Sequence, residues 1–249
     1  MGLTVVIPSL GLNALLRCCI RSLETALGNA ECEARIIVVD NASPDPYRPG
    51  EFGARTEIMR MDVPRSFSNA CNRAAFAAPN DVVLFLNNDV LLHPEAVSDI
   101  LETMRETGAA ICGARLVYPD DTIQHCGVRI GGPLPEPYHE FSRRPTATIS
   151  RAVRDYQVVT GAALAVRYDV FRELDGFDEI FPFSYEDVDF CLRARQKGYR
   201  VTCAQRVDSI HFESITPGRF AREQGARAIF EKRWAGRCTI DSIEGHYLD

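Results

Sequence analysis

The sequence predicts an α/β fold in which a mostly parallel central sheet is flanked by helices within a single large domain. Three observations support this expectation. Short runs of β-branched and aliphatic residues alternate with segments of helical periodicity, which is typical of parallel sheets. The chain has 249 residues, 46% hydrophobic and 25% charged, which suffices for a large core. Several apolar runs end in polar residues that could share one edge of the sheet.

The alternation of strands and helices is clearest in the first half. We expect strands within residues 3–9, 34–45 and 82–86, and helices within 13–27, 67–78 and 94–107. Ser66 or Ser68 is the expected cap of the second helix, and Pro94 suits the first turn of the third. This order of elements predicts a parallel sheet with helices on its faces.

The second half of the chain is less regular. Residues 131–151 are rich in Gly, Pro, Ser and Thr and predict a long loop, either a surface loop or a lid over a bound ligand. Further strands are expected within residues 157–167 and 199–203. A helix is expected from Glu186 and another from about Pro217.

Composition and charge narrow the function classes. The net charge of −6 argues against a nucleic-acid-binding protein, and no apolar run approaches the roughly 20 residues that span a bilayer. The N-terminus lacks the basic and apolar pattern of a secretory leader. The nine cysteines are odd in number and form no C-x-x-C pair, which argues against a disulfide framework or a zinc site. We therefore expect a soluble protein of the reducing cytoplasm.

Polar residues follow three of the predicted strands. They are Pro8 and Ser9, Asp40 and Asn41, and Asn87, Asn88 and Asp89. In open α/β sheets, ligands bind beyond the carboxyl ends of the strands. We therefore expect these residues to meet at one edge of the sheet and to form a ligand site.

The triplet Asn87-Asn88-Asp89 interrupts an otherwise apolar run. Burying an unpaired carboxylate costs several kcal/mol, so something must compensate Asp89. If the strand continues through the triplet, Asn87 and Asp89 share one side, and their oxygens suit Mg²⁺ or Mn²⁺. The alternative is an Asx-rich turn between strand and helix.

Acidic residues gather in the segment before and within the helix that is expected from Glu186. They are Asp178, Glu179, Glu186, Asp187 and Asp189. A capping box of Ser184 and Asp187, together with the helix dipole, would explain acids at this helix start. Alternatively, one carboxylate could accept a proton from an incoming hydroxyl. His211 is either an ordinary hydrogen-bonded histidine or a metal ligand.

Seven segments, taken in order over about residues 3 to 215, resemble glycosyltransferase family 2, the inverting nucleotide-sugar enzymes of GT-A fold. The chain is most similar to the rhamnosyltransferase-like bacterial branch. The pair "LFLNNDV" and "GFDE…YEDVDFCLR" is the most specific part of the resemblance. The segments are "VVIPSL", "IIVVDNASPD", "FSNACNRAA", "VLFLNNDVLLHPEA", "YPDDTIQHCG", "VVTGAALAVRYDVFRELDGFDEIFPFSYEDVDFCLRARQKGYRV" and "HFES".

The resemblance implies a role for each matching residue. Asp187 would be the catalytic base, and Asp89 with His211 would bind a divalent cation, Mn²⁺ or Mg²⁺. Asn87 stands where the family's D-x-D motif has its first carboxylate, so we expect weaker cation binding. The family's frequent glycines are missing from "SNACNRA", which leaves the donor contacts of this loop open. The nucleotide sugar would be bound by Pro8, Ser9, Asp40, Asn41, Asn69, Asn72, Asn87, Asn88 and Glu186.

The resemblance also implies a reaction. A sugar would pass from a nucleoside diphosphate (a UDP- or dTDP-sugar, dTDP-rhamnose among them) to a hydroxyl of a glycan or lipid-linked acceptor in bacterial surface polysaccharide synthesis. Residues 1–249 would form one GT-A domain. About 1–90 would bind the nucleotide sugar, about 91–215 would serve the acceptor and catalysis, and about 216–249 would form a helical tail. The expected location is the cytoplasm, with peripheral contact at the inner face of the membrane as an option, and the oligomeric state stays open.

Two other functions remain alternatives. A nucleotidyltransferase that makes nucleotide sugars also uses a parallel sheet and a divalent ion, but it needs a glycine-rich basic loop after the first strand. The segment "PSLGLNALLR" contains only Gly11 and Arg17 of the required kind, and the lysines, Lys197 and Lys232, are distant in sequence. A non-catalytic nucleotide-sugar-binding domain is the second alternative, because fold alone does not establish activity.

Overall fold

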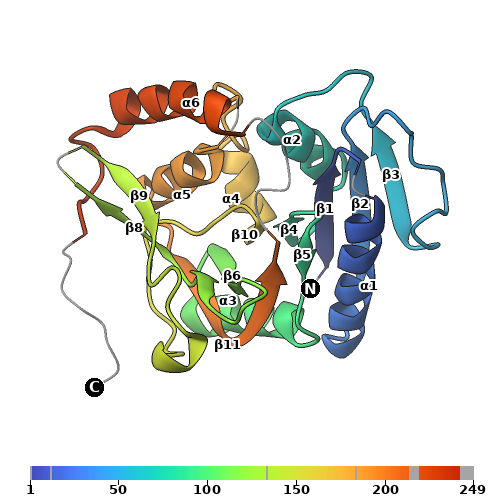
Figure 1. Ribbon diagram of the computed structural model, residues 1–249, viewed down its shortest axis with the longest axis horizontal. Helices are drawn as coiled ribbons and strands as arrows, with labels where there is room; N and C mark the ends of the chain where they lie inside the picture. The colour runs from blue at the N-terminus through green and yellow to red at the C-terminus, as the bar shows by residue number, and fades with distance from the viewer. Residues whose placement is uncertain (1, 12, 133, 183, 213–218, 242–249) are drawn as a thin grey trace.

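A computed structural model describes residues 2–11, 13–132, 134–182, 184–212 and 219–241. In this part of the chain, a central sheet of nine strands has the order β3-β2-β1-β4-β10-β6-β11-β5, and β7 pairs with β6 outside this path (Figure 1). A separate hairpin is formed by β8 (Val128–Gly131) and β9 (Glu136–His139). The strands of the central sheet are β1 (Leu3–Ser9), β2 (Ala34–Asp40), β3 (Thr56–Arg60), β4 (Val82–Leu86), β5 (Val90–Leu91), β6 (Ile111–Val117), β7 (Ile123–His125), β10 (Ala163–Arg167) and β11 (Val201–His211).

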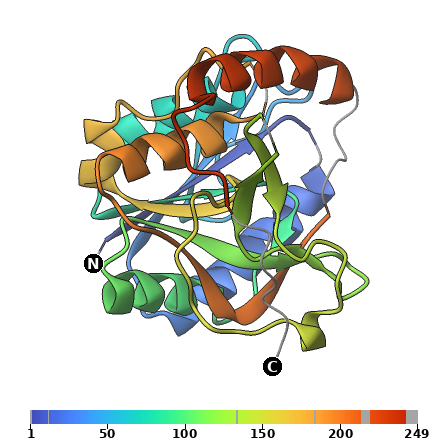
Figure 2. The same ribbon diagram turned by 90° about the vertical axis from the view of Figure 1, so that its left-hand side faces the viewer.

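Helices cover both faces of the sheet and bury an apolar layer on each. The helices are α1 (Asn13–Asn29), α2 (Phe67–Ala77), α3 (Ala96–Thr107), α4 (Tyr168–Glu173), α5 (Glu186–Gln196) and α6 (Arg219–Trp234). Alternate residues of β1 point to opposite faces, since Val6 packs with α2, α4, α5 and α6 whereas Val5 and Ile7 pack with α1 and α3. Figure 2 shows the resulting three layers.

The pairing of the strands is mixed. The strands β3, β2, β1 and β4 run parallel, as expected, and so do β6 and β11. The strand β10 runs antiparallel between β4 and β6, and β5 and β7 are also antiparallel to their partners. The α/β class is confirmed, but parallel pairing dominates only in the first half. A strand that is buried on both faces reads as one apolar run in either direction, so its sequence does not encode its direction.

The predicted helices are present, but the starts of two of them differ from the expectation. The helix α3 begins at Ala96 with Glu95 as its N-cap, so Pro94 precedes the helix and does not lie in its first turn. Ser66 caps α2, because its hydroxyl accepts a hydrogen bond from the backbone N of Asn69. The expected capping box of Ser184 and Asp187 is wrong. Tyr185 is the N-cap of α5, with a left-handed backbone (φ +70°) and no side-chain cap. The final helix begins at Arg219, while residues 213–218, and 242–249 of the predicted tail, lie outside the described residues.

The segment 131–151 is more ordered than the predicted long loop. It contains β9 and a short 3-10 helix, Thr146–Thr148. The fully buried Arg115 holds this segment in place. The Arg115 guanidinium donates hydrogen bonds to the carbonyl oxygens of Thr146 and Ser150 and lies 2.8 Å from Asp208. The segment is therefore docked on the sheet. No helix within the described residues combines the length and apolar character needed to cross a membrane.

Candidate active site

The ends of β1, β2 and β4 meet at one edge of the sheet, as the sequence predicted. The backbone N of Asn41 donates to the carbonyl oxygen of Ser9 at 2.8 Å. The side-chain amide of Asn88 donates to the Ser9 hydroxyl at 2.8 Å, and the same hydroxyl lies 2.8 Å from the hydroxyl of Tyr47. Pro8 precedes this cluster and is partly exposed. The three strand ends thus form one hydrogen-bonded polar rim.

The triplet after β4 is a turn and does not continue the strand. The strand ends at Leu86, and the backbone N of Val90 donates to the carbonyl oxygen of Asn87 at 3.2 Å. The prediction that strand alternation places Asn87 and Asp89 on one side is therefore wrong. Asn87 and Asn88 are partly exposed, whereas Asp89 is buried beneath them. A tight turn turns the carboxylate of Asp89 inward, toward β11.

Asp89 contacts His211, as expected for two residues of one site. Asp89 Oδ1 lies 3.1 Å from His211 Nε2, and both side chains are about nine-tenths buried, with exposed fractions of 10% and 8%. His211 is the last residue of β11, and its partner there, Val90 of β5, follows Asp89 directly. The short antiparallel pairing of β5 with β11 therefore places the two side chains together.

Gln124 of β7 holds the Nδ1 side of the His211 ring. Its Nε2 donates to the backbone oxygen of His211 at 3.3 Å, which turns its Oε1 toward His211 Nδ1 at 2.6 Å. The Nδ1 atom then carries a proton, so Nε2 presents a lone pair to Asp89 when the ring is neutral and donates a hydrogen bond to Asp89 when the ring is charged. In the neutral form two acceptors lie 3.1 Å apart, and they repel each other unless a cation lies beside them.

The Asp89–His211 pair therefore fits a divalent cation. A carboxylate oxygen and an imidazole nitrogen of defined tautomer are suitable ligands, and the bond to Gln124 is the kind of support that metal-binding histidines receive. Within the described residues, no cluster of three or more His, Cys, Asp or Glu side chains is arranged to hold an ion. Asp89 and His211 would thus supply two ligands and leave the other positions to water or phosphate oxygens, as is common for Mg²⁺.

His125, one residue beyond Gln124, adds no charge to this region. Burial, reinforced by His139 and His211, holds the pKa of His125 well below its ordinary value of 6.5. Its Nε2 accepts a hydrogen bond from the backbone N of Thr160 at 3.5 Å, so its Nδ1 is the donor to His139 Nδ1, 3.2 Å away. The neutral ring supports the segment before β10.

Asp40 is fully buried at the end of β2, and protein groups surround its carboxylate. Its oxygens accept hydrogen bonds from the backbone N atoms of Ser43 and Tyr47 and from the Arg60 guanidinium. Burial by itself would raise the pKa of Asp40, but these hydrogen bonds outweigh it and lower the pKa below its ordinary value of 3.8. In this structure Asp40 orders the loop that carries Ser43 and Tyr47.

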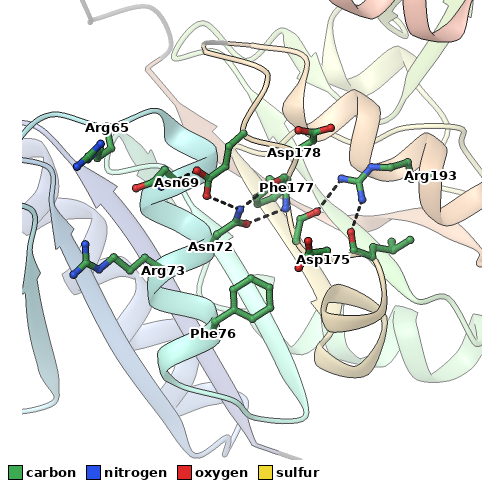
Figure 3. Close-up of a pocket in the computed structure, with 12 residues that line it drawn as sticks. Arg65, Asn69, Asn72, Arg73, Phe76, Asp175, Phe177, Asp178 and Arg193 are labelled. Atoms are coloured by element: carbon green, nitrogen blue, oxygen red, sulfur yellow. Dashed lines mark hydrogen bonds between the residues drawn. The ribbon is translucent and has the colours of Figure 1, made fainter.

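The asparagines near α2 hold neighbouring segments together. Asn41 exchanges two hydrogen bonds with the backbone of Arg65, and Asn72 exchanges two with the backbone of Phe177. Asn69 and Asn72 also donate to the two carboxylate oxygens of Glu179, at 2.8 and 3.3 Å. A polar hollow of about 700 Å³ lies between α2 and the turn before α5 (Figure 3), and Arg65, Asn69, Asn72, Phe177 and Glu179 are among the residues that line it.

The first turn of α5 presents three carboxylates with different surroundings. Asp189 is fully buried and bonded to arginines, and Glu186 is buried near Cys71 of α2. Asp187 is only half-buried, and its oxygens accept hydrogen bonds from the backbone N atoms of Gly161 at 2.7 Å and Val188 at 2.8 Å. Two of the roughly four lone-pair positions of this carboxylate are used, so Asp187 can still accept a proton.

Two residues join Asp187 to the turn after β4. Gly161 donates to Asp187, and the carbonyl oxygen of the next residue, Ala162, accepts from the backbone N of Asn87 at 2.8 Å. Because two residues span at most about 7 Å, the Asp187 carboxylate lies within roughly 13 Å of the Asn87 backbone. Asp187 and Asn87, which are far apart in the sequence, thus both contact the segment Gly161–Ala162. A sugar and a diphosphate could bridge the distance between them.

Sequence reasoning missed Gln124, Gly161, Arg60 and Tyr47. Gln124 stands inside the quoted segment "YPDDTIQHCG", but nothing in that segment points to His211, which lies 87 positions away. Gly161 acts through its backbone, and only its lack of a side chain is a signal. A Cβ at this position would stand 3.3 Å from Asp187 Cβ.

Known proteins share this sequence pattern and fold. The family model of Glycosyl transferase family 2 matches residues 4–174. The chain is 27% identical over 221 residues to the O-antigen biosynthesis protein RfbC of Myxococcus xanthus, which covers 86% of this chain and 17% of RfbC. It is 22% identical over 228 residues to the low-salt glycan biosynthesis hexosyltransferase Agl10 of Haloferax volcanii, covering 84% of this chain and 69% of Agl10. The chain thus spans about a sixth of the length of RfbC.

The fold has the same kind of neighbours. The mannosyltransferase PcManGT from Pyrobaculum calidifontis, solved in complex with GDP-Man and Mn²⁺, superposes with a TM-score of 0.62 at 15% identity, over 92% of this chain and 64% of that chain. This likeness confirms the GT-A fold that the resemblance implied. Since the family model covers well over half of the sequence, the chain belongs to glycosyl transferase family 2.

Proposed function

We propose that this chain is an inverting, cation-assisted glycosyltransferase that moves a sugar from a nucleoside diphosphate to an acceptor hydroxyl. Membership of the family supports the reaction class. The observation that carries the rest is the pair Gly161–Ala162, which contacts both Asp187 and the turn that holds Asp89. A proton acceptor and a cation site on opposite sides of a sugar-sized space are what inversion of an anomeric carbon requires.

The nucleotide would bind along the polar rim at the ends of β1, β2 and β4. Pro8, Ser9, Asn41 and Asn88 lie there with accessible surface or shared hydrogen bonds. Asp40 is enclosed, so we assign it the task of ordering the loop at Ser43. The other predicted donor-site residues are Asn69 and Asn72, which we expect to act through Glu179, together with Asn87 and Glu186.

Asp89 and His211 would hold a divalent cation, Mn²⁺ or Mg²⁺. Such an ion supplies positive charge to the diphosphate that departs during transfer. Asp89 provides the carboxylate, and Gln124 keeps the lone pair of His211 Nε2 directed at the same place. Asn87, in place of a second carboxylate, leaves this position with less negative charge than a D-x-D motif has.

Asp187 would be the base. Its half-buried carboxylate is oriented by the Gly161 and Val188 amides and still has lone pairs for a proton. As the acceptor oxygen attacks the anomeric carbon, Asp187 would take its proton, and the bond to the diphosphate would break on the opposite face. Glu186 is buried beside it, so Asp187 is the more accessible member of the pair.

The finer assignments follow from the resemblance and from the printed names of the relatives. The donor would be a UDP- or dTDP-sugar, with dTDP-rhamnose as the first candidate. The acceptor would be a glycan or a lipid-linked hydroxyl in polysaccharide synthesis, the process named for RfbC. The protein would work in the cytoplasm, at or near the inner face of the membrane.

A thermal-shift screen of nucleoside diphosphates with and without Mn²⁺ tests the donor class. At a hundred-fold excess over Kd, a bound ligand stabilises by about 2.7 kcal/mol, which is a Tm increase of about 5–10 °C for a chain of this size. We expect this increase only when nucleotide and Mn²⁺ are both present, and we expect Asp89→Ala to abolish it. Asp120→Ala, a change of an exposed aspartate, is the matched control.

Turnover tests the reaction itself. Incubation with a panel of nucleotide sugars should release nucleoside diphosphate, whereas release of pyrophosphate from a sugar phosphate and a nucleoside triphosphate would establish the nucleotidyltransferase instead. Binding without either release would favour a non-catalytic domain. If the nucleotide raises the Tm equally with and without Mn²⁺, and equally in Asp89→Ala, the cation site is refuted.

A further inference from the structure

The C-terminal helix α6 packs directly on the helix that carries the proposed base. Its apolar residues Ala226, Phe230 and Trp234 are buried in the same core as α5. Figures 1 and 2 both show α6 lying across the outer side of α5. The family model ends at residue 174, so neither helix falls in the matched region. The role of α6 must therefore be inferred from its contacts.

Asp189 is the point at which α6 meets α5. Its side chain is fully buried, and Oδ1 accepts hydrogen bonds from Arg233 at 2.8 Å and from the Trp234 indole at 3.0 Å. Oδ2 accepts from Arg193 of α5 at 2.7 Å. A buried carboxylate with three donors is held in one orientation, and removal of a donor leaves it underpaired.

A second contact reaches the residue before the helix. The ring of Phe230 stacks on Tyr185 at 5.0 Å between ring centroids. Tyr185 is the left-handed N-cap of α5, a conformation that a bulky residue adopts only when its surroundings enforce it. The helix α6 thus contacts Tyr185 and Asp189, at the start of α5. In the sequence Asp187 lies midway between these two residues.

The same network continues to α2. The guanidinium of Arg193 donates to the carbonyl oxygens of Leu174 and Gly176, and Arg233 also lies 2.8 Å from Asp178 (Figure 3 shows the Arg193 bonds). The adjacent Phe177 is the backbone partner of Asn72. A chain of hydrogen bonds therefore runs from α6 through Asp189 to the helix beside the donor site.

We propose that Arg233 and Trp234 are positioning residues for Asp187, holding the first turn of α5 so that the Asp187 carboxylate stays bonded to Gly161. The proposal rests on the proposed function, in which Asp187 is the base. Neither residue touches substrate in this account. Both act through Asp189, one half-turn of helix beyond Asp187, while Phe230 restrains Tyr185 on the other side.

Two variants test the proposal. Trp234→Phe keeps an aromatic ring in the core but removes the N–H donor, and Arg233→Gln removes the charge that pairs with Asp189. Displacing a catalytic group by about 1 Å can cost on the order of 100-fold in rate, so we expect kcat to fall by roughly 10- to 100-fold. The KM for the donor should stay within about two-fold, because the nucleotide rim is untouched. Arg233→Lys, which retains a cation, should restore part of kcat.

The matched control is Arg227→Gln on the same helix, since Arg227 pairs with Glu231 and Glu136 and not with Asp189. Amide hydrogen exchange supplies a readout that does not depend on turnover. The amides of Gly161 and Val188 donate to Asp187, so peptides that contain them should exchange faster in Trp234→Phe and Arg233→Gln but not in Arg227→Gln.

The outcomes separate this proposal from the proposed function. A kcat loss at constant KM, with faster exchange at Gly161, supports the positioning role. Equal kcat in Arg233→Gln and Arg227→Gln, or losses explained wholly by a smaller folded fraction, would overturn it. If the unaltered protein transfers no sugar, the proposed function fails, and unchanged exchange at Gly161 and Val188 in the variants would still refute the link from α6 to Asp187.

Discussion

Replacing Gln124 by leucine should weaken cation binding without removing either proposed ligand. The variant keeps Asp89 and His211 but deletes the acceptor that holds the His211 Nδ1 proton at 2.6 Å. The ring can then place its proton on Nε2, facing Asp89, where it would block a metal. Loss of such a supporting partner typically costs 10- to 100-fold in metal affinity, which corresponds to about 1.4–2.7 kcal/mol.

Gln124→Leu should also lower the stability of the protein, which limits the temperature at which binding can be measured. Gln124 is buried and donates to the His211 carbonyl, so leucine leaves that oxygen without this donor. We expect a loss of about 1–3 kcal/mol in the free energy of unfolding. Binding should therefore be measured well below the Tm of the variant. Electron paramagnetic resonance of free Mn²⁺ at saturating UDP, with a UDP-only blank, gives the affinity directly.

Two further variants separate the role of the Gln124 acceptor from a general loss of stability. Gln124→Glu retains an acceptor for Nδ1 and should keep the Mn²⁺ affinity within a few-fold of the unaltered protein. Gln157→Leu removes a glutamine that is similarly buried but bonds to Thr239 and Asp241, and it should leave Mn²⁺ binding unchanged. A folded Gln124→Leu protein with the original affinity would refute the argument that Gln124 sets the tautomer of a metal ligand.

Three other changes have defined outcomes. Asp187→Asn should lower kcat by about 10²- to 10⁴-fold with little change in donor KM, and unchanged initial-rate kinetics would place the base elsewhere. Gly161→Ala should push the Asp187 carboxylate away, because the added Cβ would stand 3.3 Å from Asp187 Cβ; kcat should drop while Mn²⁺ affinity holds, and Gly28→Ala, which meets nothing within 4 Å, is the control. Asp40→Asn should lose stability in urea titrations near neutral pH. Because hydrogen bonds lower the pKa of Asp40 in the folded protein, its contribution to the free energy of unfolding is present above the ordinary pKa of 3.8 and is lost as the pH falls from there through the lowered pKa. The difference in stability between the two proteins should therefore narrow below about pH 4. A gap of the same size at pH 3 and pH 7 would contradict this account.

The sequence predicted the elements and the converging strand ends because both are local signals. The apolar run in β1, its ending at Pro8-Ser9, and the triplet after β4 are visible without any partner strand. The direction of β10 and the hairpin of β8 and β9 were missed, since pairing direction depends on contacts between distant segments. The segment 131–151 was predicted to be a loop because of its glycines and prolines. The strand β9 within it is short and partly exposed, so it has no run of apolar residues that would indicate a strand.

The candidate site shows the same division. The residue types at Asp89, Asp187 and His211 indicated chemistry, and the structure places Asp89 beside His211. What the sequence could not give is the arrangement that supports them. Gln124 reaches His211 across 87 positions, and Ser184 proved not to cap α5 because the backbone at Tyr185 turns left-handed. The local sequence pattern therefore identified the reactive groups, whereas the residues that orient them could be identified only from the three-dimensional structure.

The position of β10 also bears on how the chain is made. Both of its neighbours, β4 and β6, precede it in the sequence, so they leave the ribosome before the strand that joins them. Until Ala163–Arg167 emerges, the edge of Val82–Leu86, five consecutive apolar residues, has no partner on that side. Unpaired apolar edges promote association between nascent chains. A translation product that stops before β10 should therefore depend on chaperones, and completion of one short antiparallel strand should mark its release from them.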